Sequence, residues 1–140
     1  MTTTPRDSKR ADGFIVTVLC LGALAYGVFG VKWLVDPTGM ATPLGITLNN
    51  GDATSDARAV YGGMELGLAA FLAFCATARS RRTLGLVAAV FSLLGLGCSR
   101  LIGILLVDSA VTGGTWQLLG TDFGGATLCA VAFFVSRKND

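Results

Sequence analysis

Four long apolar runs constrain most strongly what this chain can fold into. They cover residues 13–35, 57–78, 83–107 and 116–135. Each run has roughly 20 residues or more, the length that crosses about 30 Å of hydrocarbon at the rise of an α-helix. The runs therefore predict an all-α fold: one domain over residues 1–140 that forms a transmembrane four-helix bundle with up-down-up-down topology.

The composition favours lipid over water as the solvent of these helices. Of the 140 residues, 52% are hydrophobic and only 14% are charged, whereas soluble domains carry about 25% charged residues. A soluble four-helix bundle is the alternative, but none of the runs has a charged outer stripe at helical period. The net charge of +2, without a basic stripe that includes aromatic residues, argues against a nucleic-acid partner.

The basic residues predict how the helices cross the membrane. Eight of the 11 flank the runs on one side: Arg6, Lys9, Arg10, Arg79, Arg81, Arg82, Arg137 and Lys138. The two connections on the other side carry no Lys or Arg over residues 36–57 and 108–116. Because basic loops stay in the cytoplasm, both termini are expected there. The expected location is a cell membrane, crossed several times, of the bacterial inner-membrane type.

The start of the first run also resembles a signal peptide. Lys9 and Arg10 precede an apolar stretch that reaches small residues at Ala23 and Ala25. The apolar run continues to Val35, however, and a cleaved segment would not need that extension. Its length therefore favours an uncleaved first span.

The longest connection, residues 36–56, is expected on the outer side. Asp36-Pro37 should end the first helix, since proline cannot donate the hydrogen bond that would continue it. Residues 49–52 are typical of a turn. Ser55 or Asp56 is expected to cap the second span.

Six charged residues interrupt the apolar runs, all in the outer half of their spans. They are Lys32, Arg58, Glu65, Arg100, Asp108 and Asp122. At about 100° per residue, Arg58, Tyr61 and Glu65 share one helix face with Gly62. A charge within a membrane span costs roughly 2.5–3.5 kcal/mol on insertion scales, so each of these charges is expected to have a partner.

Depth along the antiparallel second and third spans suggests which charges pair. Glu65 lies about 10 Å below Arg58, and Arg100 lies about 12 Å below Asp108, at helical rise. Placing Arg58 level with Asp108 therefore brings Glu65 level with Arg100. Lys32 and Asp122 would join from the flanks, and the Tyr61 hydroxyl would add a donor.

Three interpretations of this charged layer remain open. The ion pairs can be structural and fix helix register. They can instead line a polar pocket for a small polar or lipid-like ligand, with Arg58, Tyr61, Glu65, Arg100, Asp108 and Asp122 as its residues. A proton- or ion-coupled path through Glu65 is disfavoured, because two arginines beside it should hold it ionised.

Little else in the sequence points to chemistry. There is no His, and the cysteines, one in each run, form no CxxC pair and are expected as small apolar fillers: Cys20, Cys75, Cys98 and Cys129. No catalytic residue, metal site or cofactor is therefore predicted. The patterns Gly63-x-x-x-Gly67 and Gly120-x-x-x-Gly124 are typical of close helix contacts.

The chain resembles a family of small bacterial four-pass membrane proteins, a domain-of-unknown-function family numbered forty-three forty-five. The resemblance rests on the run Arg58-Ala-Val-Tyr-Gly-Gly-Met-Glu-Leu-Gly67, on Arg100-Leu-Ile-Gly103 with Asp108, and on Asp36-Pro37. It covers nearly the whole chain and implies a four-helix integral membrane protein without implying an activity. The layout is also similar, at fold level only, to DoxX-like four-helix proteins.

Two functional hypotheses follow from the sequence. The first is a non-enzymatic accessory or small-ligand-binding membrane component. The alternative is a membrane-embedded enzyme or carrier that acts on a lipid-like or small polar substrate at the charged layer. The expected partners are the lipid bilayer, a lipid or small-molecule ligand and, as an open alternative, a second copy of the chain.

Overall fold

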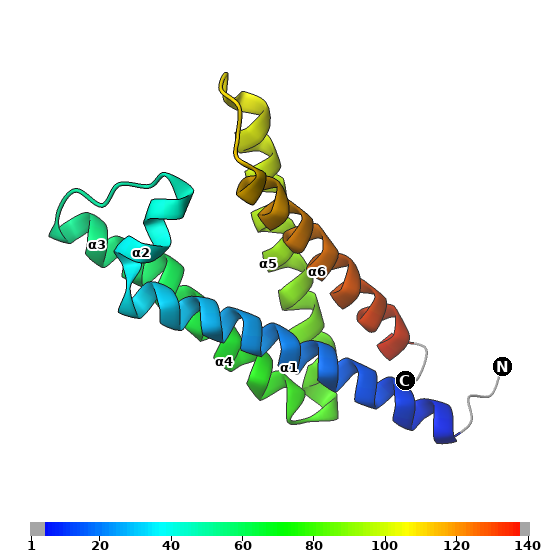
Figure 1. Cartoon of the computed structure of the whole chain (residues 1–140). Coiled ribbons are helices and arrows are strands. Elements are labelled where there is room, and N and C mark those ends of the chain that lie inside the picture. The colour runs from blue at the N-terminus through cyan, green and yellow to red at the C-terminus, as the bar shows by residue number, and fades with distance from the viewer. Residues whose placement is uncertain (1–4, 138–140) are drawn as a thin grey trace. The chain divides into compact units, whose positions relative to one another are not determined.

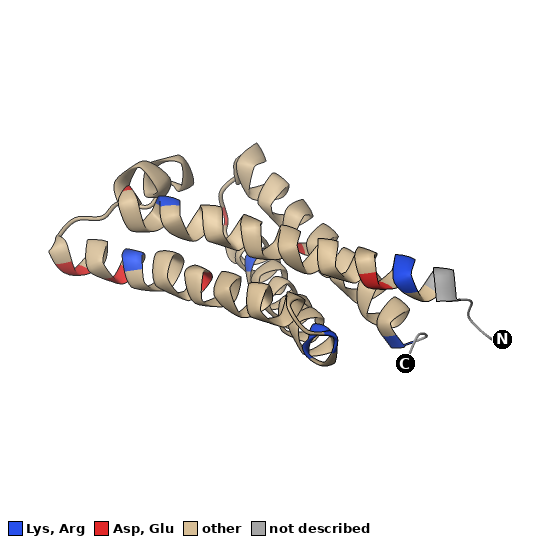
Figure 2. Ribbon diagram, turned by 90° about the horizontal axis from the view of Figure 1, so that it is seen from below, with Lys and Arg blue, Asp and Glu red and all other residues tan. Residues whose placement is uncertain are grey.

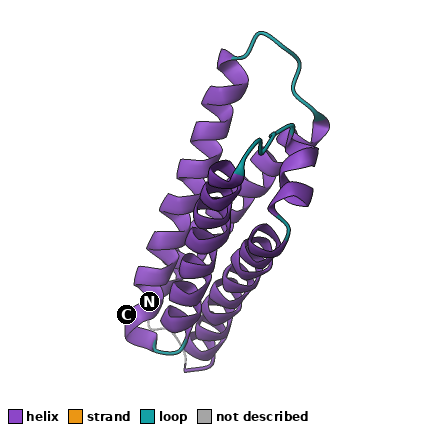
Figure 3. Cartoon of the chain, turned by 90° about the vertical axis from the view of Figure 1, so that its left-hand side faces the viewer, coloured by secondary structure: helices purple, strands orange, loops and turns teal. Residues whose placement is uncertain are grey.

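Four long helical segments make up most of the chain in the computed structural model (Figure 3). The structure describes residues 5–137, and their side chains from Ser8 onward. Four segments are long and apolar enough to cross a membrane: Ser8–Val35, Gly51–Ala76, Arg79–Leu106 and Gly113–Arg137. These segments and the absence of strands from the described residues confirm the predicted all-α, four-span architecture. The Arg6 side chain and Lys138, used above for orientation, lie outside the described residues.

The first helix, α1 (Pro5–Val35), ends where the sequence predicted. Asp36 follows it and caps the short helix α2 (Pro37–Ala41), accepting a hydrogen bond from the Gly39 backbone N–H at 2.9 Å. A 3₁₀ turn, η1 (Thr42–Leu44), continues from α2 and ends at Gly45 with φ of 70°. Glycine suits this position because the left-handed conformation is strained for residues with a Cβ.

The second span begins earlier than predicted. Helix α3 (Gly51–Ala57) is capped by Asn50, whose side chain accepts a hydrogen bond from the Ala53 N–H at 2.8 Å. The expectation that Ser55 or Asp56 caps this span is therefore wrong, since both lie inside α3. Asparagine is as good an N-cap as serine or aspartate. The apolar run was used to predict where the second span begins, but the polar helix α3 precedes that run.

A π-helical segment, η2 (Arg58–Gly63), joins α3 to α4 (Met64–Ala76) within the second span. A π-turn bonds residues i and i+5 and so winds more residues per turn than an α-helix. The α-helical spacing assumed for Arg58, Tyr61 and Glu65 is therefore wrong for this stretch. Segments of this kind are rare and occur often at functional sites.

The chain divides into two compact units. The first consists of the residues up to Leu19 together with those from Cys75 onward, and the second consists of Cys20–Phe74. In the second unit, α1 runs along η2 and α4 (Figure 1). A Cβ added at Gly30 would lie 2.9 Å from the Gly62 carbonyl oxygen. These two glycines thus let the backbones of α1 and η2 touch.

In the first unit, α5 (Arg79–Leu106) packs antiparallel against α6 (Gly113–Arg137) (Figure 1). Their contact uses glycine on both helices. A Cβ at Gly97 would lie 3.2 Å from the Phe123 ring, and one at Gly125 would lie 3.1 Å from the Leu93 side chain.

The two predicted small-residue patterns do not make these contacts. A Cβ added at Gly67, Gly120 or Gly124 would meet nothing within 4 Å in the described chain. The glycines that bring helices together are neighbours of the predicted ones, such as Gly62 and Gly125. A spacing of four residues identifies a small-residue stripe, but the packed face depends on the rotation of the helix, which the spacing leaves open.

Candidate functional site

Charged residues are sparse along the long helices, which makes each one informative (Figure 2). Arg58 opens η2, and its Nε–H donates a hydrogen bond to the Leu34 carbonyl oxygen at 3.0 Å. Leu34 lies in the last turn of α1, where carbonyl groups lack partners within their own helix. Arg58 therefore caps the end of α1 with a positive charge, which the helix dipole favours.

The contact with Leu34 leaves most of the guanidinium group available. Arg58 is exposed, and its hydrogen bond to Leu34 uses one of its N–H groups. A guanidinium group carries five N–H donors in a planar fork that suits carboxylate or phosphate oxygens. The N–H groups that do not bond Leu34 can therefore bind an anionic group.

Tyr61 lies beside this cation on η2 and stacks on Trp33 of α1. The ring centroids are 4.6 Å apart and the planes are inclined by 28°. Trp33 is buried, with 1% of its surface exposed, whereas Tyr61 is 42% exposed. Trp33 also packs with Ala41 and Ala57, and Met40 and Leu48 of the outer connection add to this cluster. The connection thus fixes the Trp33 ring on which Tyr61 stacks.

Glu65 follows in the first turn of α4 and is half-buried. Its carboxylate is expected to be favourable there, because the N-terminal end of a helix carries partial positive charge. Arg58, Tyr61 and Glu65 thus belong to one continuous segment of the second unit. We call these three residues the Arg58 centre.

Arg100 and Asp122 form the clearest ion pair of the predicted layer. Arg100 Nε lies 3.0 Å from Asp122 Oδ2, joining α5 to α6. The side chains are 28% and 9% exposed, respectively. The sequence placed Asp122 only at the flank of the layer, whereas the structure makes it a direct partner of Arg100. The sequence signal that could have found the pair is the short connection between the two helices, which forces them to be antiparallel neighbours.

Asp108 lies just beyond α5 and is exposed. The predicted pairs Arg58–Asp108 and Glu65–Arg100 join residues of different units and stay predictions. Lys32 is exposed in the last turn of α1. Within the second unit, Lys32 has no ion pair with a described side chain.

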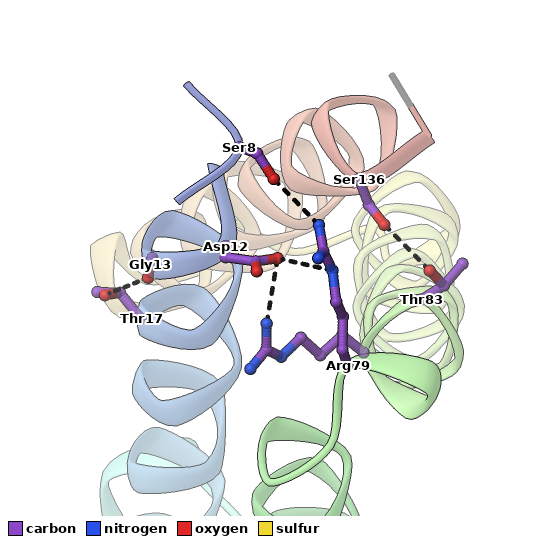
Figure 4. Close-up of polar contacts among 8 residues, drawn as sticks. Ser8, Asp12, Gly13, Thr17, Arg79, Thr83 and Ser136 are labelled. Carbon is purple, nitrogen blue, oxygen red and sulfur yellow. Dashed lines mark hydrogen bonds and ion pairs between the residues drawn. The ribbon is translucent and has the colours of Figure 1, made fainter. Parts of the chain in front are cut away.

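Sequence reasoning missed a second polar cluster, at the opposite ends of these helices (Figure 4). Asp12 of α1 accepts from two arginines of α5, with Arg79 Nε at 3.4 Å and Arg82 Nη1 at 3.2 Å. Arg79 also donates to the Ser8 hydroxyl at 3.2 Å. The sequence analysis used the arginines only for orientation and overlooked Asp12, the acidic residue directly before the first span.

A neutral contact accompanies this cluster. The hydroxyl groups of Thr83 on α5 and Ser136 on α6 lie 3.0 Å apart (Figure 4). Ser136 is buried, so the contact satisfies a polar group that would otherwise be costly in a membrane. Together these contacts tie the starts of α1 and α5 and the end of α6 within the first unit.

The cysteines and acidic residues offer no further site. All four cysteines are free, with Cys75 and Cys129 buried. Within the described part of the chain, no three His, Cys, Asp or Glu residues gather as metal ligands. The remaining candidates are therefore the Arg58 centre and the Arg100–Asp122 pair.

Four helices that are long and apolar enough to cross a membrane define a multi-pass integral membrane protein. Within that class, the chain belongs to the family described as a domain of unknown function (DUF4345), whose profile matches residues 13–133. The match confirms the family resemblance found in the sequence. No curated protein and no solved structure matches the chain.

Proposed function

We propose that this protein is a non-enzymatic accessory component of the cell membrane that binds a small anionic or lipid-like ligand at the Arg58 centre. The observation that carries the proposal is the hydrogen bonding of the Arg58 side chain. Its guanidinium group is held in place by one neutral backbone carbonyl, at 3.0 Å, which leaves its other N–H groups for a ligand. An intramembrane or interfacial cation of this kind is by default a candidate for ligand binding.

Two neighbouring features support a binding role. Arg58 and Tyr61 lie on a π-helical segment, a conformation that is rare and frequent at functional sites. The Tyr61 ring rests on buried Trp33, which fixes its position without using the hydroxyl group. The tyrosine hydroxyl can therefore donate to an oxygen of the same ligand.

The Arg100–Asp122 pair has a different role in this proposal. Each charge already has its partner, and Asp122 is buried between α5 and α6. Such a pair fixes the register of two helices and needs no ligand. We therefore assign it a structural role, and we keep Asp108 as an exposed carboxylate without an assigned role.

The proposed orientation places both termini in the cytoplasm and the Arg58 centre in the outer leaflet. The distribution of basic residues supports this orientation. Lys9 and Arg10 lie near the start of α1, and Arg79 and Arg82 lie at the start of α5, the helix ends that are proposed to face the cytoplasm. Cysteine-accessibility labelling of residues near Gly45 and near Arg79 from each side of the membrane tests this orientation.

Native mass spectrometry of the protein released from its own membranes tests ligand binding. We expect a bound anionic species on the wild-type protein and its loss from Arg58→Gln, which keeps a polar side chain but removes the charge. Lys9→Gln removes a charge from an exposed position of α1 and should keep the adduct. An adduct that persists in Arg58→Gln, or a wild-type protein free of adducts, would contradict the proposal.

A further inference from the structure

A groove runs along α1 in the second unit, beside Leu66 of α4. It encloses about 410 Å³ and is almost wholly apolar. Five apolar residues of α1 line it together with Leu66 of α4: Ala23, Leu24, Gly27, Val28 and Val31. Their spacing of three and four residues places them on one stripe of the helix. Small residues at positions 23 and 27 hollow this stripe between larger neighbours.

The outer end of the groove carries a positive charge. Lys32 lies in the last turn of α1 and lines the groove. Its side chain is exposed and has no hydrogen bond or ion pair with another described side chain. A lysine so close to a helix end can extend its ammonium group toward the membrane surface while its methylene groups stay in the apolar region.

The combination of an apolar groove and a cation at its outer end matches an amphiphile with an anionic head. We propose that the groove binds one acyl chain of an anionic phospholipid whose phosphate group contacts Lys32. The acyl chain fits the apolar stripe from Ala23 to Val31, a rise of about 12 Å along the helix. Lys32 selects the charge of the headgroup, because the surrounding bilayer offers acyl chains of every lipid equally.

This site is distinct from the Arg58 centre, none of whose residues lines the groove. The acyl chain gains little by leaving other lipid tails, since those tails are as apolar as the groove. The preference for this lipid therefore rests on the headgroup. One lysine near a membrane surface is expected to favour an anionic over a zwitterionic headgroup by about fivefold.

Lipid counting in nanodiscs tests the headgroup preference. The full-length protein is placed in equimolar phosphatidylglycerol and phosphatidylcholine, and the lipids that remain bound are identified by native mass spectrometry. We expect about fivefold enrichment of phosphatidylglycerol in the wild type, its loss in Lys32→Gln and its retention in Lys9→Gln. Equal retention of both lipids by the wild type, or unchanged enrichment in Lys32→Gln, would overturn the proposal.

A quenching experiment tests the position of the acyl chain. With Trp33 and Trp116 changed to Phe, one tryptophan is introduced in the groove by Leu24→Trp or outside it by Phe29→Trp; both positions are exposed. Brominated phosphatidylglycerol should quench the groove tryptophan more strongly than brominated phosphatidylcholine does, and the two lipids should quench the outside tryptophan equally. Equal quenching by both lipids at Leu24→Trp, in protein whose helical circular dichroism is intact, would refute binding in the groove. Loss of the Arg58 adduct alone would leave both results unchanged.

Discussion

The Arg100–Asp122 pair and the Arg58 centre show two ways to keep charge in an apolar helix. Between α5 and α6, Arg100 faces a buried carboxylate at 3.0 Å, so charge is balanced by charge. In the second unit, Arg58 is held at the same distance by a neutral carbonyl at the end of α1. In the first arrangement the two charges neutralise each other, whereas in the second the carbonyl is neutral and the charge of Arg58 is not cancelled by that contact.

The difference extends to the backbone and the packing around each charge. Arg100 and Asp122 lie on regular α-helices in contact through Gly97. The Arg58 centre lies on a π-helical segment supported by a buried tryptophan and a folded connection. A closed ion pair needs only two straight helices, whereas an available cation needs a scaffold that holds it without neutralising it.

The largest expected effect comes from removing the aromatic support of the Arg58 centre. Trp33→Ala should lower the free energy of unfolding by about 3–5 kcal/mol, because it leaves a cavity beneath Tyr61 and the outer connection. SDS titration in mixed micelles, followed by circular dichroism, measures the change. Trp116→Ala, at a position 53% exposed, is the matched control and should change stability by less than about 1 kcal/mol. Equal losses in both variants would show that Trp33 gives no special support.

Breaking the ion pair between Arg100 and Asp122 should give the second largest loss of stability. Asp122→Ala leaves Arg100 without its carboxylate and should cost about 3 kcal/mol, since the partner charge stays partly buried. The same SDS titration reads the loss, and the exposed Asp108→Ala serves as control, with an expected change within about 0.5 kcal/mol. The charge swap Arg100→Asp with Asp122→Arg should recover part of the stability. If Asp122→Ala were as stable as Asp108→Ala, the pair would have no structural role.

The close backbone contact of the second unit gives a smaller effect. Gly30→Ala places a methyl group 2.9 Å from the Gly62 carbonyl oxygen and the Leu66 side chain, and should cost about 1–3 kcal/mol through overpacking. Gly67→Ala adds the same group where nothing lies within 4 Å and should leave stability unchanged or raise it by up to about 1 kcal/mol. Thermal unfolding in bicelles compares the two variants, and a destabilised Gly67→Ala would contradict the packing described.

The smallest expected loss of stability comes from removing a neutral hydrogen bond of the first unit, and it distinguishes neutral from ionic contacts there. Thr83→Val removes the hydroxyl contact with Ser136 and should cost about 0.6 kcal/mol, the average for such contacts between membrane helices. Thr127→Val is matched in chemistry, but its hydroxyl bonds only the Phe123 carbonyl of its own helix. The difference in unfolding free energy between the two variants measures the contact. A loss in Thr83→Val as large as that in Asp122→Ala would remove the distinction between the two kinds of contact.

The helices were predictable because each apolar run is long enough to cross a membrane and each end carries a turn signal. Asp36-Pro37 ended the first helix as expected. Hydropathy could not place the start of the second span, because the polar helix α3 precedes its apolar part and is capped by Asn50. The family followed from local motifs around Arg58 and Arg100.

The candidate site was harder to predict because partner choice depends on rotation and on neighbours. Depth along a helix suggested which charges could lie level, yet it treated Glu65 and Asp122 as unequal candidates for Arg100. The structure gives Arg100 the carboxylate of Asp122 at hydrogen-bond distance. The pattern of apolar residues does not reveal the π-helix at Arg58–Gly63. The group that accepts the hydrogen bond of Arg58 is a backbone carbonyl, which every residue type has. Neither feature leaves a signal in residue types.

The central claim is that Arg58 is available to a ligand whereas Arg100 is committed to the fold. Comparing Arg58→Gln with Arg100→Gln, with bound adduct and unfolding free energy measured on the same samples, tests it most directly. We predict that Arg58→Gln loses the anionic adduct with a stability cost of only about 1 kcal/mol. Arg100→Gln should keep the adduct on its folded fraction and lose about 3 kcal/mol. The reverse pattern, with the adduct lost in Arg100→Gln and retained in Arg58→Gln, would contradict the account.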